Sequence, residues 1–220
     1  MVNTTAVLLA AGAGTRLGRG PKALLPFSGR TLVEHAAAVL RDGGCSGVVV
    51  VVGAGAAEVA ALPGLAGCRL VPNEDWASGM GGSFRLGVAA AAGNSPGNTV
   101  LVALVDQPGV TAALVSRLIA AHRPGRVTAA GYPSGALSPD SPGLHRGHPI
   151  IFDPALASRA AAASKGDAGA RDFLRAHPGL IDLVDCGDLF DGADLDTESD
   201  LHLLNGHLAS PVHDHARKQS

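Results

Sequence analysis

A glycine-rich stretch near the start of the chain carries two arginines and a lysine, and two of these three side chains are candidates for phosphate binding. It reads AVLLAAGAGTRLGRGPKALLPF over residues 6–27, so an apolar, strand-like run passes directly into glycines. The small residues at 10–14 let the backbone approach a base and phosphates closely, and their N–H groups can receive anionic oxygens. Arg16 and Lys22 add positive charge where a triphosphate would lie. We therefore predict a nucleotide-binding loop here, rather than a glycine turn with solvated basic residues.

Two better-known glycine loops do not fit this stretch. The dinucleotide fingerprint G-x-G-x-x-G matches at Gly12 and Gly14, but the third glycine, Gly18, comes one position late. The ATPase phosphate loop requires Ser or Thr after its lysine, and Lys22 is followed by Ala23. Both templates fail, which leaves a third kind of nucleotide cradle.

The elements that must position this loop alternate between buried strands and helices. Short apolar runs at residues 5–10, 48–52, 69–71, 99–105, 147–152 and 180–184 predict strands. Residues 31–41, 56–62, 83–92, 111–122, 155–163 and 168–176 predict helices, and a further helix follows the DLDTESDL segment. Such alternation predicts a three-layer α/β/α fold with a Rossmann-like, mostly parallel sheet.

In a sheet of this kind, ligands bind beyond the carboxyl ends of the strands. The loop at 11–19 follows one predicted strand, and Asp106 follows another. A carboxylate at the end of a buried strand is costly unless it meets a cation, although Asp106 could also cap the turn that precedes Pro108. The stretch 131–147 has no periodic pattern and is predicted to be a surface loop or part of an acceptor lid. We expect one domain over 1–209 and a disordered tail over 210–220.

Composition excludes several classes of protein. The chain has 220 residues with 46% hydrophobic residues, enough for one substantial core, and a net charge of −2 argues against nucleic-acid binding. Cys45, Cys68 and Cys186 lie far apart without a CxxC pair, so neither a zinc site nor a disulfide framework is predicted. No signal sequence or bilayer-length apolar run is present, and we expect a cytoplasmic protein with no membrane partner.

Several motifs together resemble the MobA-like nucleotidyltransferases. The glycine stretch is followed, in the order typical of that family, by NEDWASGMGGSFRLG (73–87), LVDQP (104–108), GHPIIF (147–152), GDAGARDFL (166–174) and DLDTESDL (194–201). The resemblance spans about 200 residues. Within the family, the chain is most similar to the molybdenum cofactor cytidylyltransferases. It implies a fold of the nucleotide-diphospho-sugar transferase (GT-A-like) type.

The resemblance also implies roles for individual residues. Arg16, Lys22 and Asp106 would be catalytic, with Lys22 near the α-phosphate, and Asp106 and Asp196 would hold Mg²⁺. Asp194 is the alternative to Asp196 as the second metal ligand. Asp196 could instead serve only as the N-terminal cap of the helix that follows. On the acceptor side, His148 and Arg171 are candidates, against a packed histidine and a surface arginine. The implied nucleotide-binding residues are Leu9, Ala10, Ala11, Gly12, Ala13, Gly14, Thr15, Arg16, Lys22, Gly79, Gly82 and Ser83.

The activity implied is transfer of CMP from CTP to molybdopterin cofactor with release of pyrophosphate. Cytidylyltransferases of the family tend to have LAAG where guanylyltransferases have LAGG, and this chain has LAAG with Ala11 lining the base pocket by analogy. Val105 replaces the usual glycine of GDQP, which leaves the acceptor open. A molybdoenzyme or its chaperone is a candidate partner. The alternatives are another NTP with a sugar phosphate or other small phosphorylated acceptor, a non-catalytic nucleotide-binding protein, and a nicotinamide-dependent oxidoreductase, against which the late third glycine argues.

Overall fold

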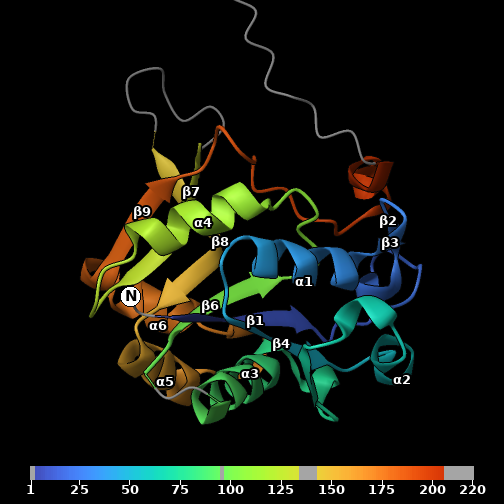
Figure 1. The fold of residues 1–220 in the computed structure, drawn as a ribbon, viewed down its shortest axis with the longest axis horizontal. Helices are drawn as coiled ribbons and strands as arrows, with labels where there is room; N and C mark the ends of the chain where they lie inside the picture. Colours follow the sequence, from blue (N-terminus) through green and yellow to red (C-terminus); the bar gives the residue numbers. More distant parts are fainter. Residues whose placement is uncertain (1–2, 95–96, 134–142, 206–220) are drawn as a thin grey trace, which may run out of the picture.

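A single seven-stranded sheet forms the centre of the molecule in a computed structural model, which describes residues 3–94, 97–133 and 143–205 (Figure 1). The strand order is β5-β4-β1-β6-β8-β7-β9. The strands are β1 (Thr4–Ala10), β4 (Gly47–Val52), β5 (Arg69–Pro72), β6 (Thr99–Leu104), β7 (Val127–Pro133), β8 (Leu144–Phe152) and β9 (Ile181–Asp185). A separate antiparallel pair consists of β2 (Pro26–Phe27) and β3 (Arg30–Thr31).

All but one of the sheet strands run in the same direction. Strand β1 pairs in parallel with β4 and β6, β4 pairs in parallel with β5, and β7 pairs in parallel with β9. Strand β8 is antiparallel to both of its neighbours, β6 and β7. The mostly parallel sheet predicted from the alternation of buried strands and helices is therefore confirmed.

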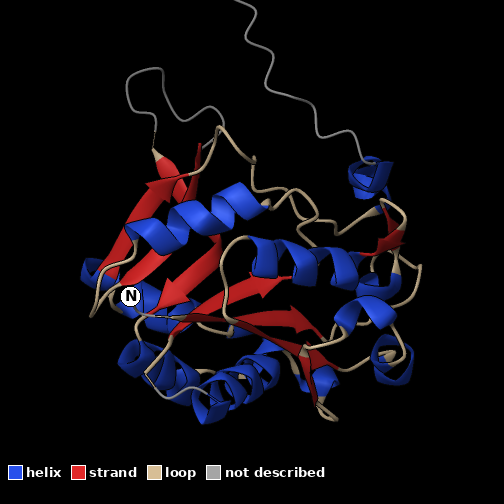
Figure 2. Ribbon diagram, viewed as in Figure 1, coloured by secondary structure: helices blue, strands red, loops and turns tan. Residues whose placement is uncertain are grey.

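Helices cover both faces of the sheet, as expected for a three-layer arrangement (Figure 2). Helices α1 (Leu32–Asp42) and α4 (Ala112–Ala121) lie on one face, and α3 (Met80–Asn94), α5 (Pro154–Ala163) and α6 (Arg171–Ala176) lie on the other. The remaining helical segments are α2 (Ala56–Ala60) and the 3₁₀ helices η1 (Lys22–Leu24), η2 (Pro63–Leu65), η3 (Trp76–Ser78), η4 (Gly166–Ala168), η5 (Pro178–Leu180) and η6 (Glu198–Asn205).

The core consists of two layers that the alternating side chains of the strands separate. On β1, Leu8 packs with the layer under α1 and α4, whereas Val7 and Leu9 pack with the layer under α3 and α5. Because successive side chains of a strand point to opposite faces, each parallel strand contributes to both layers. This is why these strands are continuously apolar in the sequence.

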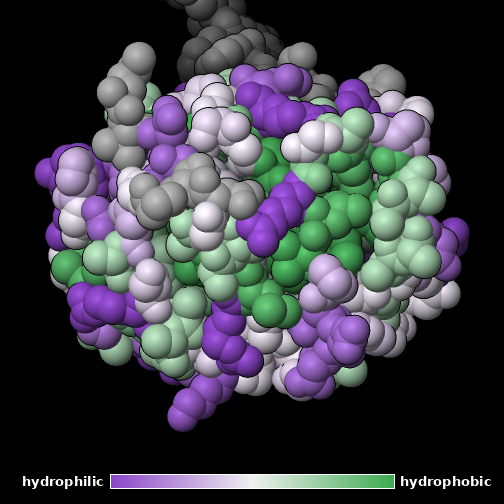
Figure 3. Space-filling view, turned by 60° about the horizontal axis from the view of Figure 1, so that its bottom comes forward, coloured by the Kyte–Doolittle hydropathy of each residue, from purple (hydrophilic) through white to green (hydrophobic). Residues whose placement is uncertain are grey.

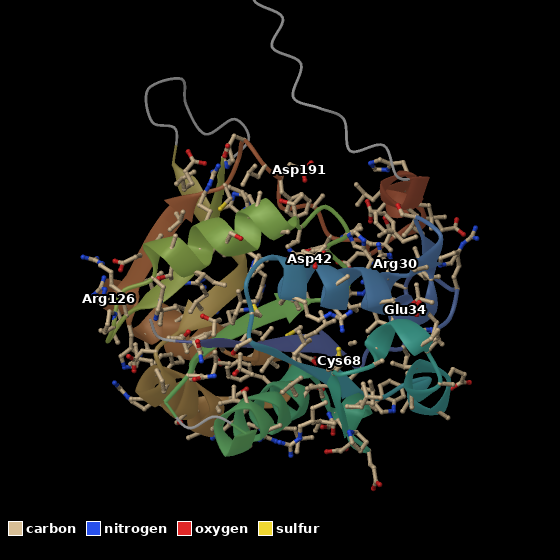
Figure 4. The ribbon with its side chains drawn as sticks, viewed as in Figure 1. Arg30, Glu34, Asp42, Cys68, Arg126 and Asp191 are labelled. Carbon is tan, nitrogen blue, oxygen red and sulfur yellow. The ribbon has the colours of Figure 1, made fainter. Side chains whose placement is uncertain are left out.

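Helix α1 is fixed at its start by a capping box. The Thr31 hydroxyl accepts a hydrogen bond from the Glu34 N–H, and the Thr31 N–H donates to the Glu34 carboxylate at 3.0 Å. The other Glu34 oxygen accepts from the Gly64 N–H at 2.9 Å, which ties α1 to η2. Glu34 therefore lies between two elements, on the side of the molecule away from Arg126 (Figure 4).

One predicted loop is partly wrong. Residues 131–133 and 144–147 lie in β7 and β8, not in a loop, and Gly131 pairs with Arg146 across the two strands. Tyr132 is fully buried and its hydroxyl donates to the His148 carbonyl at 2.6 Å. Strand β7 pairs with β8 and β9, and β8 pairs with β6 and β7. The glycines and prolines within this segment interrupt the apolar pattern that would otherwise indicate strands. The residues between them, 134–142, lie outside the described part of the chain.

The surface in Figure 3 shows hydrophobic residues gathered in a hollowed area with hydrophilic residues around it. Among the described residues, the exposed large hydrophobic side chains are those of Met80, Leu86 and Leu183, at 39%, 39% and 42%. Within the described ranges, no helix combines the length and the apolarity that crossing a bilayer requires. The tail predicted to be disordered, 210–220, lies outside the described residues, and the single domain over 1–209 remains a prediction.

Candidate active site

A pocket of about 380 Å³ opens where strands β1 and β6 end, as the strand-end rule predicts. Its walls come from the glycine loop after β1, the end of β6, the η3–α3 segment and η4. The lining residues are Leu9, Ala11, Gly12, Ala13, Gly14, Thr15, Arg16, Lys22, Trp76, Ala77, Gly79, Met80, Ser83, Leu104, Val105, Asp106, Asp167 and Asp196. The volume is within the range of small-molecule sites.

The glycine loop is held in place through its backbone. The Ala11 carbonyl accepts from the Ala54 N–H at 3.1 Å, and the Gly14 carbonyl accepts from the Leu17 N–H at 3.1 Å. Gly14 has φ +65°, and a Cβ there would collide with the Gly20 carbonyl oxygen. The loop therefore needs glycine at position 14, both for its left-handed conformation and for the close return of the chain.

Lys22 is placed by η1 between two carboxylates from distant parts of the sequence. Its ammonium donates to Asp106 at 2.9 Å and to Asp196 at 2.6 Å. The Lys22 side chain is only 13% exposed. Burial acts to lower the pKa of Lys22, but the charge of Asp106 and the hydrogen bonds to both carboxylates outweigh it, so the pKa is raised. The lysine thus stays charged, and three of the residues predicted to carry catalysis or bind metal meet at one point.

The segment 194–196 is pinned against the end of β6 on both sides of the chain. The Leu195 N–H donates to the Asp106 carbonyl at 2.8 Å, and the Leu195 side chain is fully buried. Gln107 is 7% exposed and donates from Nε2 to Asp194 at 2.8 Å. Burial raises the pKa of the Asp194 carboxyl, and the charges of Asp106 and Asp196 raise it further. Asp194 is thus engaged by Gln107, and Asp196 is the carboxylate that reaches Lys22.

Asp106 and Asp196 have the right chemistry for Mg²⁺, because hard cations prefer carboxylate oxygens. Their oxygens already converge on one cation, the Lys22 ammonium, which shows that both can face a shared positive charge. In the described part of the chain, no group of three or more His, Cys, Asp or Glu residues is gathered closely enough to hold a metal ion by itself. The two aspartates therefore offer the kind of oxygen donors that a divalent cation takes.

The opposite wall combines close backbone packing with apolar side chains. Gly79 has φ +117°, and Gly79 and Gly81 pack directly on η4, where a Cβ on either would lie within 3 Å of Gly166 atoms. Ser83 lines the pocket while its hydroxyl accepts from the Asn73 side-chain amide at 2.9 Å. Trp76 and Met80 also line this wall. These two residues and Asp167 were not among the predicted site residues.

Four predicted site residues are not on the pocket wall. Ala10 is buried in the core layer beneath α1, and Gly82 lies next to Asn73. His148 is in β8, where its carbonyl accepts from Tyr132, and burial, reinforced by Arg146, lowers the pKa of its imidazole to about 4. Arg171 begins α6 and is exposed. From the GDAGAR motif the pocket receives Asp167 instead of the arginine.

Comparisons with known proteins give one family. A family model described as the MobA-like NTP transferase domain matches residues 6–180. The protein named nicotine blue oxidoreductase from Paenarthrobacter nicotinovorans is 53% identical over 201 residues, covering 91% of this chain and 95% of that protein.

Solved structures show the same fold. Rv0371c from Mycobacterium tuberculosis H37Rv aligns with a TM-score of 0.78 and 27% identity over 93% of this chain and 98% of that one. A second structure of Rv0371c, described as a complex with manganese, gives 0.73 and 26% over 93% and 99%. A nucleotidyl transferase from Methanothermobacter gives 0.75 and 24% over 92% and 96%.

These structures confirm the nucleotide-diphospho-sugar transferase type of fold, and the family match confirms the resemblance that the motifs indicate. The chain belongs to the MobA-like NTP transferase family.

Proposed function

We propose that this protein is a Mg²⁺-dependent nucleotidyltransferase that transfers CMP from CTP to molybdopterin cofactor and releases pyrophosphate. The observation that carries the proposal is the meeting of Lys22, Asp106 and Asp196 beside the glycine loop. The Lys22 side chain is largely buried and lies between two carboxylates beside the glycine loop. This arrangement suits a reaction in which phosphate charge must be neutralised.

In the reaction, an oxygen of the acceptor phosphate attacks the α-phosphorus of the nucleotide, and the bond to the pyrophosphate oxygen breaks. The N–H groups of the loop and the Arg16 guanidinium would bind the triphosphate, and Lys22 would stabilise charge at the α-phosphate. Asp106 and Asp196 would hold Mg²⁺, which when bound neutralises phosphate charge and aligns the leaving group. The complex of Rv0371c with manganese supports a divalent metal in this fold.

The choice of CTP and of molybdopterin rests on finer features. Ala11 of the LAAG sequence lines the pocket, where the family resemblance places the base. The molybdopterin acceptor rests on the DQP and GHP motifs alone. Another NTP, with a sugar phosphate as acceptor, is the alternative within the same chemistry.

A second candidate function is favoured by one observation. The 53% identical relative is named nicotine blue oxidoreductase, so a nicotinamide-dependent oxidoreductase that acts on nicotine blue is a candidate for this chain. The spacing of the glycines in this chain, however, does not match the dinucleotide fingerprint. Nicotinamide cofactors would also need no pair of carboxylates on a lysine, whereas nucleotidyl transfer has a use for each of them.

One experiment separates the two candidates. Pyrophosphate release is measured with each of the four NTPs and Mg²⁺, with molybdenum cofactor, with a sugar phosphate and without any acceptor. Nicotine blue reduction is measured with NADH and NADPH without any NTP. We expect pyrophosphate release only with CTP and cofactor, and its loss in Asp106→Ala. The matched control is Asp172→Ala, an exposed aspartate of α6 that does not line the pocket.

Three outcomes would contradict the proposal in different ways. Equal release with a sugar phosphate removes the acceptor assignment. Wild-type rates in Asp106→Ala remove the role of that carboxylate. Reduction of nicotine blue, together with no pyrophosphate release from any of the four NTPs, would favour the second candidate function over nucleotidyl transfer.

A further inference from the structure

Asp167 is a third carboxylate in the pocket, on the wall opposite the one that carries Lys22. It belongs to η4, which packs against the start of α3. A Cβ on Gly79 would lie 2.5 Å from Oδ1 of Asp167, so the carboxylate lies directly over the backbone of that glycine. Only a residue without a side chain at position 79 leaves room for it.

Asp167 differs from the other two carboxylates in its surroundings within the described part of the chain. Asp106 and Asp196 both accept hydrogen bonds from Lys22. Among the described residues, none donates a hydrogen bond to Asp167 or forms an ion pair with it, and the cations that line the pocket are Arg16 and Lys22. Asp167 is an exposed residue that water can solvate in the free protein. Because an ionised carboxylate is an acceptor only, a ligand that replaces this water must bring N–H or O–H donors. A phosphate group would be repelled there.

The side chains beside Asp167 favour a flat, apolar ring. Trp76 and Met80 line the same wall, and Trp76 is fixed at its base because its Cβ packs over Gly53. Aromatic faces and thioethers both pack well on planar heterocycles. Two features of the ligand follow: a planar ring against Trp76 and Met80, and a donor edge toward Asp167.

We propose that Asp167 recognises the amino or ring N–H edge of a planar heterocycle that packs against Trp76 and Met80. This inference rests on the proposed function and refines its substrate recognition. Two groups share the chemistry: the exocyclic amine of cytosine in CTP, which uracil lacks, and the amine of the pterin ring in the acceptor. In either case the residue determines specificity and does not touch the reacting phosphorus.

The chain offers an intrinsic probe of this wall, because Trp76 is its single tryptophan. Binding of CTP, of UTP and of a free 2-amino-4-oxopteridine is followed by quenching of Trp76 fluorescence, and by calorimetry where the probe absorbs. The variant is Asp167→Asn, which keeps the shape but loses the charge. Asp172→Asn, a nearby aspartate outside the pocket, is the control.

We expect Asp167→Asn to weaken one ligand five- to tenfold. A lower affinity for CTP with an unchanged affinity for UTP identifies the base as the ligand. A lower affinity for the pteridine with unchanged affinities for both nucleotides identifies the acceptor ring. Unchanged affinity for all three probes overturns the proposal, as does binding seen by calorimetry without any quenching of Trp76. If the wild type releases no pyrophosphate from any of the four NTPs, the proposed function fails, and the pterin titration alone then decides the role of Asp167.

Discussion

Lys22 controls the charge balance of the pocket, because it is the cation that Asp106 and Asp196 share. In the free protein its ammonium occupies a position between oxygens that would also hold a metal. Lys22→Met removes this competing cation and leaves two carboxylates without a partner. We therefore expect the variant to bind Mn²⁺ alone at least fivefold more tightly, while nucleotidyl transfer falls by at least about a hundredfold.

The measurement for Lys22 is a Mn²⁺ titration by electron paramagnetic resonance without nucleotide, together with a turnover assay. Lys165→Met is the matched control, since Lys165 is exposed and does not line the pocket. Weaker Mn²⁺ binding in Lys22→Met would show that the lysine orders the two carboxylates instead of competing with the metal.

The individual site residues show where sequence reasoning succeeds and where it stops. Arg16, Lys22 and Asp106 line one pocket as predicted, because a cation in a glycine loop and a carboxylate at a strand end leave few alternatives. Arg171 and Asp167 come from the same GDAGAR motif, and only the aspartate reaches the pocket. Which of two polar side chains faces inward depends on the turn of η4 against α3, which no local pattern encodes.

The segment 194–196 belongs to the scale of elements, because its position decides where Asp196 lies. The Gln107 side-chain amide donates a hydrogen bond to the Asp194 carboxylate at 2.8 Å, and the Asp106 backbone carbonyl accepts one from the Leu195 N–H. We expect Asp194→Ala to release this segment and to raise the Mg²⁺ concentration needed for half-maximal turnover about tenfold. Asp194→Asn keeps an oxygen that Gln107 can donate to and should stay within about threefold of the wild type.

The pair of Asp194 variants also tests the alternative that Asp194 is itself a metal ligand. In that case the asparagine variant would lose as much Mg²⁺ dependence as the alanine variant, because both remove the charge. Thermal unfolding of each variant is the control. Equal melting temperatures show that the change lies in the site and not in the fold.

The start of α1 supplies a prediction about pH. Hydrogen bonds from the Thr31 N–H, opposed by burial and joined by bonds from the Thr31 hydroxyl and Gly64, lower the pKa of Glu34. A carboxylate with a lowered folded-state pKa stabilises the fold fully above its unfolded pKa, and this contribution is lost as the pH falls through the folded pKa. We expect Glu34→Ala to cost about 1–2 kcal/mol at neutral pH and less at an acidic pH, below the ordinary pKa of a glutamate.

Urea denaturation of the wild type and of Glu34→Ala at the two pH values measures this difference. Glu58→Ala is the control, since Glu58 is an exposed residue of α2, a helix whose start has no side-chain capping hydrogen bond. A difference between wild type and variant that stays the same at both pH values would mean that packing, not the carboxylate, holds the helix start.

Elements differ in how well the sequence predicts them, for a physical reason. Strands β1, β4 and β6 are buried on both faces, so their apolar runs are unmistakable. Strands β7 and β8 depend on mutual pairing, and their shared segment contains Gly131, Pro133 and Gly147. Tyr132 is buried between such residues because Phe190 and Gly192 pack on its ring, and these lie far along the chain. The sequence predicts the 147–152 part of β8, whereas β7 and the first residues of β8 become visible only through their tertiary contacts.

At the scale of the whole molecule, the sheet separates function from stability. The pocket lies at the ends of β1 and β6, whereas the edge strand β9 is held by charges that face α4 and β7. There Asp182 accepts hydrogen bonds from Arg126 at 2.6 and 3.1 Å and from Arg123 at 2.9 Å. None of these three residues lines the pocket.

This separation leads to a prediction for Asp182→Asn. The hydrogen bonds from Arg126, opposed by burial and helped by Arg123, lower the pKa of Asp182 to about 2. Its contribution is therefore complete above its unfolded pKa of about 4 and is lost as the pH falls toward 2. We expect the variant to lose roughly 1–3 kcal/mol of unfolding free energy at neutral pH and to show a flatter stability profile between those two values.

Equilibrium unfolding across that range measures the profile, and titration with CTP and Mg²⁺ at neutral pH should give wild-type affinity. A variant whose nucleotide affinity falls together with its stability would show that the far edge of the sheet is coupled to the pocket.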